Sequence, residues 1–242
     1  MKKNRTTATA LNPLQVTLRK LANSQDAQSQ RRFFKTGPGE YGEGDVFIGV
    51  RVPEIRKIVA SIKNPDLEII KELLSSTIHE ERLLALLLMV RLFEKGDDKT
   101  RADIRECYIN NIDSVNNWDL VDSSAPNILG AYLFTKNKKP LYGLVKSSSM
   151  WHRRIAIMAS FQFIKQGQFK DTLKLSKILL SDEHDLIHKA VGWMLREIGK
   201  RDLAVEEIFL KQHYAMMPRT MLRYAIEHFP ETRRQRYLKG KV

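Results

Sequence analysis

Apolar residues recur at intervals of three and four along almost the whole chain, which is the spacing that places them on one face of an α-helix. Alternating apolar and polar runs joined by Asn-Gly or Asp-Gly turns, which mark β-hairpins, are nearly absent. The pattern therefore predicts an all-α protein. The predicted helices span residues 13–34, 53–62, 65–75, 79–95, 98–112, 117–135, 139–147, 151–166, 169–181, 184–199, 202–214 and 217–229.

Three of these helices resemble one another in sequence, those that contain Ala85, Ala156 and Ala190. The alanines are separated by 71 and 34 residues, so the period is about 35 residues, and the helix that contains Asp122 lies where a further copy belongs. Such a period is typical of helical repeats that bury their apolar faces against their neighbours. We expect a curved α-solenoid of HEAT-like antiparallel helix pairs, with a concave basic face as the binding surface.

The same pattern suggests one domain with two short extensions. Residues 13–230 carry the helical periodicity, residues 1–12 form a flexible basic N-terminal arm, and residues 231–242 form a frayed basic C-terminal tail. The N-terminus lacks the apolar core of a secretory signal, and a short basic arm explains it better than a transit peptide.

The net charge of the chain indicates which kind of molecule it binds. The 242 residues include 41 Lys and Arg against 28 Asp and Glu, a formal net charge of +13 that favours a polyanion, nucleic acid before an anionic membrane surface. The longest apolar run, residues 83–90, falls short of the roughly 18 residues that would span a bilayer. The single cysteine, Cys107, fits a reducing compartment, so we expect a cytoplasmic protein that associates with the nucleoid.

Glycines interrupt the helical pattern between residues 33 and 57 and predict an ordered loop. Their spacing fits neither a Walker loop nor a Rossmann fingerprint, because no strand precedes them and no Gly-Lys-Ser/Thr follows. Two interpretations remain open: a long connector, or a loop close to a phosphate backbone with Lys35, Tyr41 and Arg51 beside it.

Two further groups of cations are candidates for DNA binding. Lys189, Trp193, Arg196 and Lys200 form one stripe of the helix at 184–199, which is either a nucleic-acid surface or a tryptophan at the core edge covered by cationic side chains. Arg153 and Arg154 stand near a helix start, where the macrodipole disfavours cations. They are either phosphate ligands or surface arginines without a role.

Trp118 and Asp122 stand four residues apart, so both project from one face of the predicted helix. Asp119 is best explained as a residue that stabilises the helix start. Asp122 is different, because a carboxylate in a basic groove repels phosphate. Its presence suggests that something cationic is stabilised there.

Other chemistries are not supported by the sequence. His184 and His188 have the spacing of metal ligands on a helix, but no third ligand accompanies them. Ser123 and Ser124 lack the flanking glycines of a nucleophile elbow. We therefore expect neither a metal nor a cofactor.

Four motifs in order make the chain resemble the AlkD-type DNA alkylation repair enzymes, a family of HEAT-like-repeat DNA glycosylases. They lie at residues 34–56, 118–123, 151–157 and 188–200. The resemblance implies an enzyme that excises N3- and N7-alkylated purines from duplex DNA without flipping the lesion into a pocket. It also implies roles for four residues in one cleft: Asp122 as the catalytic carboxylate, Trp118 and Trp193 as indoles against the sugar backbone, and Arg154.

The residue types fit that chemistry. An alkylated purine such as 3-methyladenine or 7-methylguanine is already cationic and leaves without a general acid, whereas the sugar develops positive charge that a carboxylate and aromatic faces stabilise. No lysine is placed as a Schiff-base nucleophile, so we expect a monofunctional, monomeric hydrolase without an obligate protein partner. The alternatives are a non-catalytic HEAT-repeat protein that binds bent or branched DNA and a protein-interaction solenoid.

Overall fold

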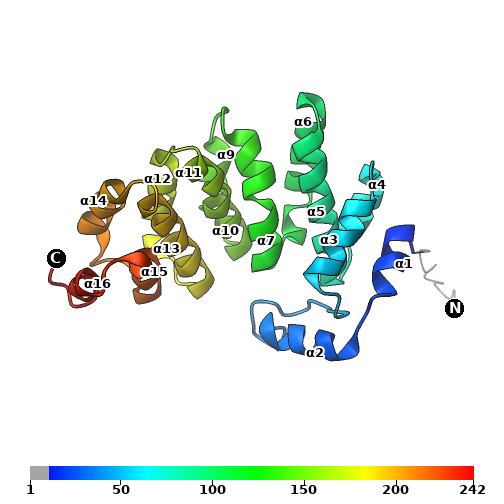
Figure 1. Cartoon of the computed structure of the whole chain (residues 1–242), viewed down its shortest axis with the longest axis horizontal. Coiled ribbons are helices and arrows are strands. Elements are labelled where there is room, and N and C mark those ends of the chain that lie inside the picture. Colours follow the sequence, from blue (N-terminus) through cyan, green and yellow to red (C-terminus); the bar gives the residue numbers. More distant parts are fainter. Residues whose placement is uncertain (1–10) are drawn as a thin grey trace, which may run out of the picture. The chain divides into compact units, whose positions relative to one another are not determined.

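A computed structural model of the chain describes residues 11–242, and over this range it contains helices and no strand, which confirms the predicted all-α class (Figure 1). The described residues form two compact units, one ending at Leu88 and one beginning at Met89. Residues 1–10, most of the predicted N-terminal arm, lie outside the described residues. No helix within residues 11–242 is long and apolar enough to cross a membrane.

The first unit contains four helices and the start of a fifth that continues past the boundary. They are α1 (Pro13–Arg19), α2 (Ser24–Phe33), α3 (Val52–Ser61), α4 (Leu67–Leu74) and α5 (His79–Lys95). The single helix predicted over 13–34 is wrong. The Asn23 side chain accepts hydrogen bonds from the amides of Gln25 and Asp26 as an N-cap, and its own amide donates to the Ile48 carbonyl at 2.9 Å.

The second unit is a series of helices joined by short turns. Its elements are α6 (Asp98–Asn110), η1 (Ile112–Ser114), α7 (Trp118–Ser124), η2 (Pro126–Gly130), α8 (Ala131–Leu133), α9 (Lys139–Leu144), α10 (Met150–Ala159), α11 (Phe161–Lys165), α12 (Lys170–Ile178), η3 (Leu179–Ser181), α13 (Asp185–Gly199), α14 (Leu203–His213), α15 (Arg219–Ala225), η4 (Ile226–His228) and α16 (Glu231–Leu238).

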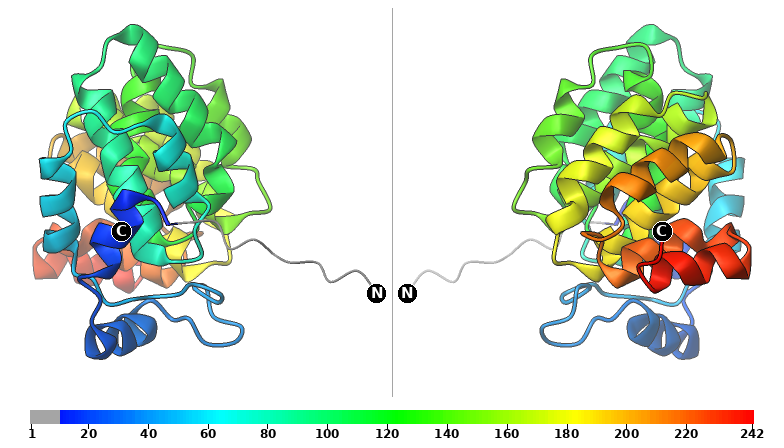
Figure 2. Two further views of the ribbon diagram at one scale, coloured as in Figure 1. Left: turned by 90° about the vertical axis from the view of Figure 1, so that its right-hand side faces the viewer. Right: turned by 90° about the vertical axis from the view of Figure 1, so that its left-hand side faces the viewer.

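Within this unit, α7, α10, α13 and α15 pack against one another in chain order (Figures 1 and 2). Helices α9, α12 and α14 each precede one member of that row, so the chain is built of consecutive helix pairs. Ala156 and Ala190, which marked the repeat in the sequence, are fully buried in α10 and α13. The row therefore carries every candidate catalytic residue of the site described below.

Two glycines allow close backbone packing against helices of the row. A Cβ atom at Gly192 of α13 would lie 2.4 Å from the Met221 carbonyl oxygen of α15, and one at Gly130 would lie 2.2 Å from the Ala159 carbonyl oxygen of α10. Both distances are shorter than any side chain tolerates. Backbone packing at these two contacts therefore requires glycine.

A widened turn follows α7. Pro126 has no amide hydrogen and cannot donate to the carbonyl of Asp122, four residues earlier. The chain accommodates it with the π-helical turn η2, in which the amide of Gly130 donates to the Ala125 carbonyl at 2.9 Å. Turns of this kind often lie beside functional sites.

The C-terminal segment differs from the frayed tail predicted for residues 231–242. It forms α16, and Tyr237 is buried against the rings of Tyr214 and Phe229. Tyr237 thus anchors the segment to the preceding elements, and Glu231 in the first turn favours the helix.

Candidate active site

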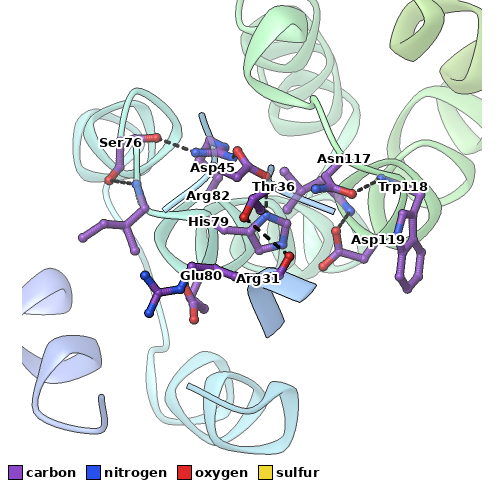
Figure 3. A network of polar contacts seen from close by, with 12 residues as sticks. Arg31, Thr36, Asp45, Ser76, His79, Glu80, Arg82, Asn117, Trp118 and Asp119 are labelled. Carbon is purple, nitrogen blue, oxygen red and sulfur yellow. Dashed lines mark hydrogen bonds and ion pairs between the residues drawn. The ribbon is translucent and has the colours of Figure 1, made fainter. Parts of the chain in front are cut away.

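The site begins at the start of α7, where side chains satisfy free backbone amides. The Asn117 side chain accepts a hydrogen bond from the Trp118 amide at 2.8 Å, and Asp119 Oδ1 accepts one from the Leu120 amide at 2.8 Å (Figure 3). Asp119 thus stabilises the helix start, as the sequence suggested. Trp118 is held at the first helical position, with its side chain only partly buried.

Asp122 does not cap its helix. Its carboxylate accepts two parallel hydrogen bonds from the Arg154 guanidinium, Nε to Oδ1 at 3.0 Å and Nη2 to Oδ2 at 2.8 Å. The remaining Arg154 donor, Nη1, reaches the Leu186 carbonyl at 2.5 Å. One arginine from α10 therefore fixes the carboxylate of α7 and the start of α13 together.

Burial sets the electrostatics of this pair. The Asp122 side chain is 18% exposed and the Arg154 side chain 5% exposed. Burial raises the pKa of the Asp122 carboxyl above its ordinary value, and the charge and hydrogen bonds of Arg154 oppose that shift. The result is a rigid, poorly hydrated carboxylate with a small opening to solvent. Such a group stabilises a nearby cation more strongly than one in bulk water does.

Trp193 lies on α13, seven residues beyond Leu186 and therefore on the same side of the helix. Its ring packs against Phe161, with the ring centroids 6.0 Å apart. Burial raises the pKa of Glu197, but hydrogen bonds from Lys200, Arg201 and Trp193 lower it overall. The indole is thus held in place on two sides. The structure brings three of the four predicted residues onto the adjacent helices α7 and α10 and the fourth onto the next helix of the row.

Comparison with known proteins identifies the fold that carries this arrangement. Residues 14–229 match the family described as DNA alkylation repair enzyme. The chain belongs to that family. No curated protein sequence matches it.

Solved structures agree with the family at the level of the fold. A predicted DNA alkylation repair enzyme from Enterococcus faecalis is 17% identical, with a TM-score of 0.66 over 87% of this chain and 97% of the other. AlkD2 from Streptococcus mutans is 20% identical, with a TM-score of 0.51 over 84% of this chain and 97% of the other. Membership of the DNA alkylation repair enzyme family implies that the chain binds DNA.

Most of the cations predicted to bind DNA form ion pairs with carboxylates of the same chain. The sequence indicates only those pairs that lie within one helix. The pairs are Arg51 with Asp26 at 2.8 Å, Arg153 with Asp182 at 2.6 Å, Lys189 with Asp185 at 2.7 Å, Lys200 with Glu197 at 2.6 Å, and Arg196 with Glu227. Arg153 also donates to the carbonyls of Ser147 and Ser148. Arg153 therefore has a clear structural role at the start of α10.

The glycine-rich loop lies in the first unit and is ordered. Lys35 adopts a left-handed backbone conformation with φ of 52°, and the Tyr41 hydroxyl donates to the Phe33 carbonyl at 3.4 Å. The Glu80 carboxylate accepts hydrogen bonds from three consecutive amides, those of residues 48–50, at 2.7 to 3.2 Å. A buried carboxylate of α5 thus fixes the end of the loop.

A second polar network in the first unit was not foreseen from the sequence. Asp45 of the loop accepts from Arg82 and contacts His79 Nδ1 at 3.0 Å, and all three side chains are buried (Figure 3). The His79 ring also stacks on Phe47, with centroids 4.4 Å apart. The signal was present as the run His-Glu-Glu-Arg at the start of α5, but its partner Asp45 lies 34 residues earlier than His79.

The histidine pair near α13 serves the helix start. His184 Nδ1 accepts a hydrogen bond from the Leu186 amide at 3.2 Å, and His188 Nε2 contacts the Asp182 carbonyl. Within residues 11–242 no group of three His, Cys, Asp or Glu side chains could hold a metal ion. Of the serines, Ser124 hydrogen-bonds with the buried Tyr108 hydroxyl at 3.1 Å.

Proposed function

We propose that the protein is a monofunctional DNA glycosylase, which hydrolyses the N-glycosidic bond of cationic N3- and N7-alkylated purines, such as 3-methyladenine and 7-methylguanine, in duplex DNA. Membership of the DNA alkylation repair enzyme family supports the reaction class. The observation that carries the proposal is the Asp122 carboxylate, which is held rigidly by Arg154 and open to solvent on one side.

The chemistry follows from that geometry. The alkylated base carries a positive charge, so the bond between its nitrogen and the sugar breaks without protonation by the enzyme. Positive charge then develops on the sugar, where the Asp122 carboxylate stabilises it and also accepts a proton from the attacking water. Trp118, at the start of the same helix, offers its ring face to the sugar. No chain amine takes part, and the product is an abasic site in an intact strand.

Arg154 has a positioning role in this scheme. Its two hydrogen bonds prevent the Asp122 carboxylate from rotating towards a bound sugar. The DNA must therefore bring the sugar to the carboxylate. This favours a mode in which the duplex lies against the helix row and the lesion stays in the base stack. We further propose that the enzyme acts as a cytoplasmic monomer at the nucleoid.

The decisive experiment removes the negative charge of Asp122. Asp122→Asn should reduce the release of 7-methylguanine from methylated duplex DNA by at least about 100-fold, since electrostatic groups of this kind contribute about 10²–10³ to the rate. DNA affinity should stay equal or rise, because a negative charge near phosphates is lost. Free base is measured by chromatography and affinity by fluorescence anisotropy.

Asp119→Asn is the matched control, since it alters the other carboxylate of the helix without touching Arg154, and it should retain activity. Normal excision by Asp122→Asn would refute the catalytic assignment. Strand breaks that arise without heat or alkali would contradict a monofunctional reaction.

One observation favours a second function, a non-catalytic protein that binds bent or branched DNA. The Asp122–Arg154 pair also ties three helices together, so it has a structural use that requires no chemistry. The same assay separates the two functions, because binding to methylated duplex without release of free base would support the binding protein.

A further inference from the structure

A groove between α12 and α14 has no part in the proposed reaction. It encloses a cavity of about 270 Å³ in the second unit, where the two helices lie side by side (Figures 1 and 2). Its floor is apolar and is formed by Leu173, Val205, Ile208 and Phe209. Cavities that hold whole small ligands measure about 300–1,000 Å³, so this one is suited to a few anchoring side chains.

Part of the apolar lining is open to solvent. Ile208, which lines the cavity, is 59% exposed. Single exposed apolar residues are common on soluble proteins, but Ile208 adjoins the three other apolar residues that line the cavity, and a contiguous apolar patch of this kind marks an interaction site. The groove therefore has the apolar surface on which protein segments dock.

The rim of the groove is basic. Lys170, Lys174 and Lys177 follow the spacing i, i+4, i+7 and form one stripe on α12, and the last two line the cavity. Within residues 11–242 none of the three has a carboxylate partner, unlike the paired cations of α13. No Asp or Glu lines the cavity. This charge is therefore available to an anionic partner.

His213 adds a polar contact inside the groove. Burial and the charge of Lys177 lower the pKa of its ring, so the ring is neutral at neutral pH. Among the described residues its buried Nδ1 atom has no hydrogen-bond partner. The neutral imidazole therefore adds no charge to the basic rim.

We propose that this groove docks an acidic amphipathic helix of a partner protein, whose apolar side chains fill the cavity while its carboxylates pair with Lys174 and Lys177. Helices that dock in this way place their anchors at i, i+3, i+4 and i+7. DNA fits less well, because a phosphate backbone offers nothing to an apolar floor. The chain's own residues 1–10, MKKNRTTATA, contain no acid and cannot neutralise the rim.

The test uses the full chain and a designed fluorescent peptide with leucines at the four anchor positions and glutamates elsewhere. Fluorescence anisotropy should show saturable binding that Ile208→Asp weakens by about tenfold or more, as expected for a central anchor contact. Met216→Asp is the matched control, because Met216 is 62% exposed and lies outside the cavity lining. It should bind the peptide normally.

Charge is tested in the same assay. The double substitution Lys174→Glu/Lys177→Glu should weaken peptide binding and flatten its salt dependence, whereas Lys20→Glu/Lys63→Glu in the first unit should not. Both groove variants should release 7-methylguanine at the normal rate. This makes the groove separable from the proposed reaction.

Several results would overturn the proposal. They are the absence of saturable binding, equal binding of a peptide of the same composition with a scrambled order, and an unaffected Ile208→Asp variant. Loss of affinity for unmodified duplex DNA in the double lysine variant, without peptide binding, would assign the stripe to DNA instead. Self-association of the wild type that Ile208→Asp abolishes, again without peptide binding, would assign the groove to a second copy of the chain.

Discussion

The Asp122–Arg154 pair is the residue-scale feature on which the proposed chemistry depends, and it predicts how activity varies with pH. Activity requires the carboxylate, so it should fall as pH decreases towards the pKa of Asp122, which burial raises. Arg154→Gln removes the neighbouring cation, an effect that commonly raises a carboxyl pKa by about 1–3 units. The acid limb of the kcat/KM profile should therefore move to higher pH, with activity partly restored in alkaline buffer.

Arg153→Gln is the control for this profile, because Arg153 is adjacent in sequence but pairs with Asp182. It should leave the acid limb in place. Superimposable limbs for Arg154→Gln and the wild type would mean that Asp122 does not titrate in the reaction.

A second residue-scale prediction concerns Glu206, which is fully buried in α14. Burial and the charge of Glu207 raise its pKa to about 8, while Arg196 opposes the shift. The folded state therefore holds a proton that the unfolded state releases near its ordinary pKa. Stability should fall as pH rises from about 5 to 8, with a slope of up to about 1.4 kcal/mol per pH unit.

Glu206→Gln should flatten this dependence and stabilise the protein at pH 8 and above, as measured by urea unfolding across the pH range. A variant that loses stability equally at every pH would show that the carboxyl acts only through packing.

The Asp122–Arg154 pair and the other ion pairs show what a sequence can and cannot reveal at this scale. Pairs within one helix, such as Lys189 with Asp185, follow from spacing alone. Arg196 with Glu227 joins positions 31 residues apart and depends on how helices pack. Asp122 and Arg154 were placed together only through the resemblance to a family, since no local rule connects them.

Helices of the second unit meet at glycines, and this predicts an unusual cost for a small substitution. Gly192→Ala places a Cβ atom 2.4 Å from a backbone oxygen of α15, which cannot move aside as a side chain can. It should destabilise the protein by about 1–3 kcal/mol. Gly143→Ala, at a helical glycine with no neighbour within 4 Å, should be neutral or stabilising by up to about 1 kcal/mol.

Chemical denaturation of the two variants compares the effect of a glycine-to-alanine substitution on the unfolding free energy at a tightly packed site, Gly192, and at an open site, Gly143. Equal unfolding free energies would show that α13 and α15 adjust to the added methyl group.

Sequence periodicity predicted most helices because their apolar faces are local patterns. The helix at 79–95 is confirmed over its full length, and charged residues at both ends explain why. The break before α2 escaped prediction because it depends on a hydrogen bond to Ile48, 25 residues later. The helix at the C-terminus likewise depends on the packing of Tyr237 against Tyr214 and Phe229, which no local sequence pattern predicts.

For the whole molecule, the net charge of +13 predicts DNA binding that weakens steeply with salt. Each phosphate neutralised contributes about 0.9 to the slope of log K against log salt. Glu227→Gln releases Arg196 from its partner, so it should tighten DNA binding and steepen the slope. Glu68→Gln, which frees Lys71 in the first unit, is the control for a change of charge alone.

Anisotropy titrations at several salt concentrations provide the comparison. Identical slopes for Glu227→Gln and Glu68→Gln would exclude Arg196 from the DNA surface, and salt-insensitive binding of the wild type would exclude the basic surface as a whole.

The wide turn at Pro126 has a geometric consequence for the helix row. A regular α-helix rotates about 100° per residue, so Gly130 would face about 80° away from Asp122 after eight residues. The π-helical turn contains one additional residue, so the eight residues cover only the rotation of about seven. The directions of Asp122 and Gly130 then differ by about 20°. Asp122 and Gly130 thereby face the same helix, where they meet Arg154 and the Ala159 carbonyl. The π-helical turn at Pro126 thus rotates the chain so that the hydrogen bonds of Asp122 and the close packing of Gly130 both fall on α10.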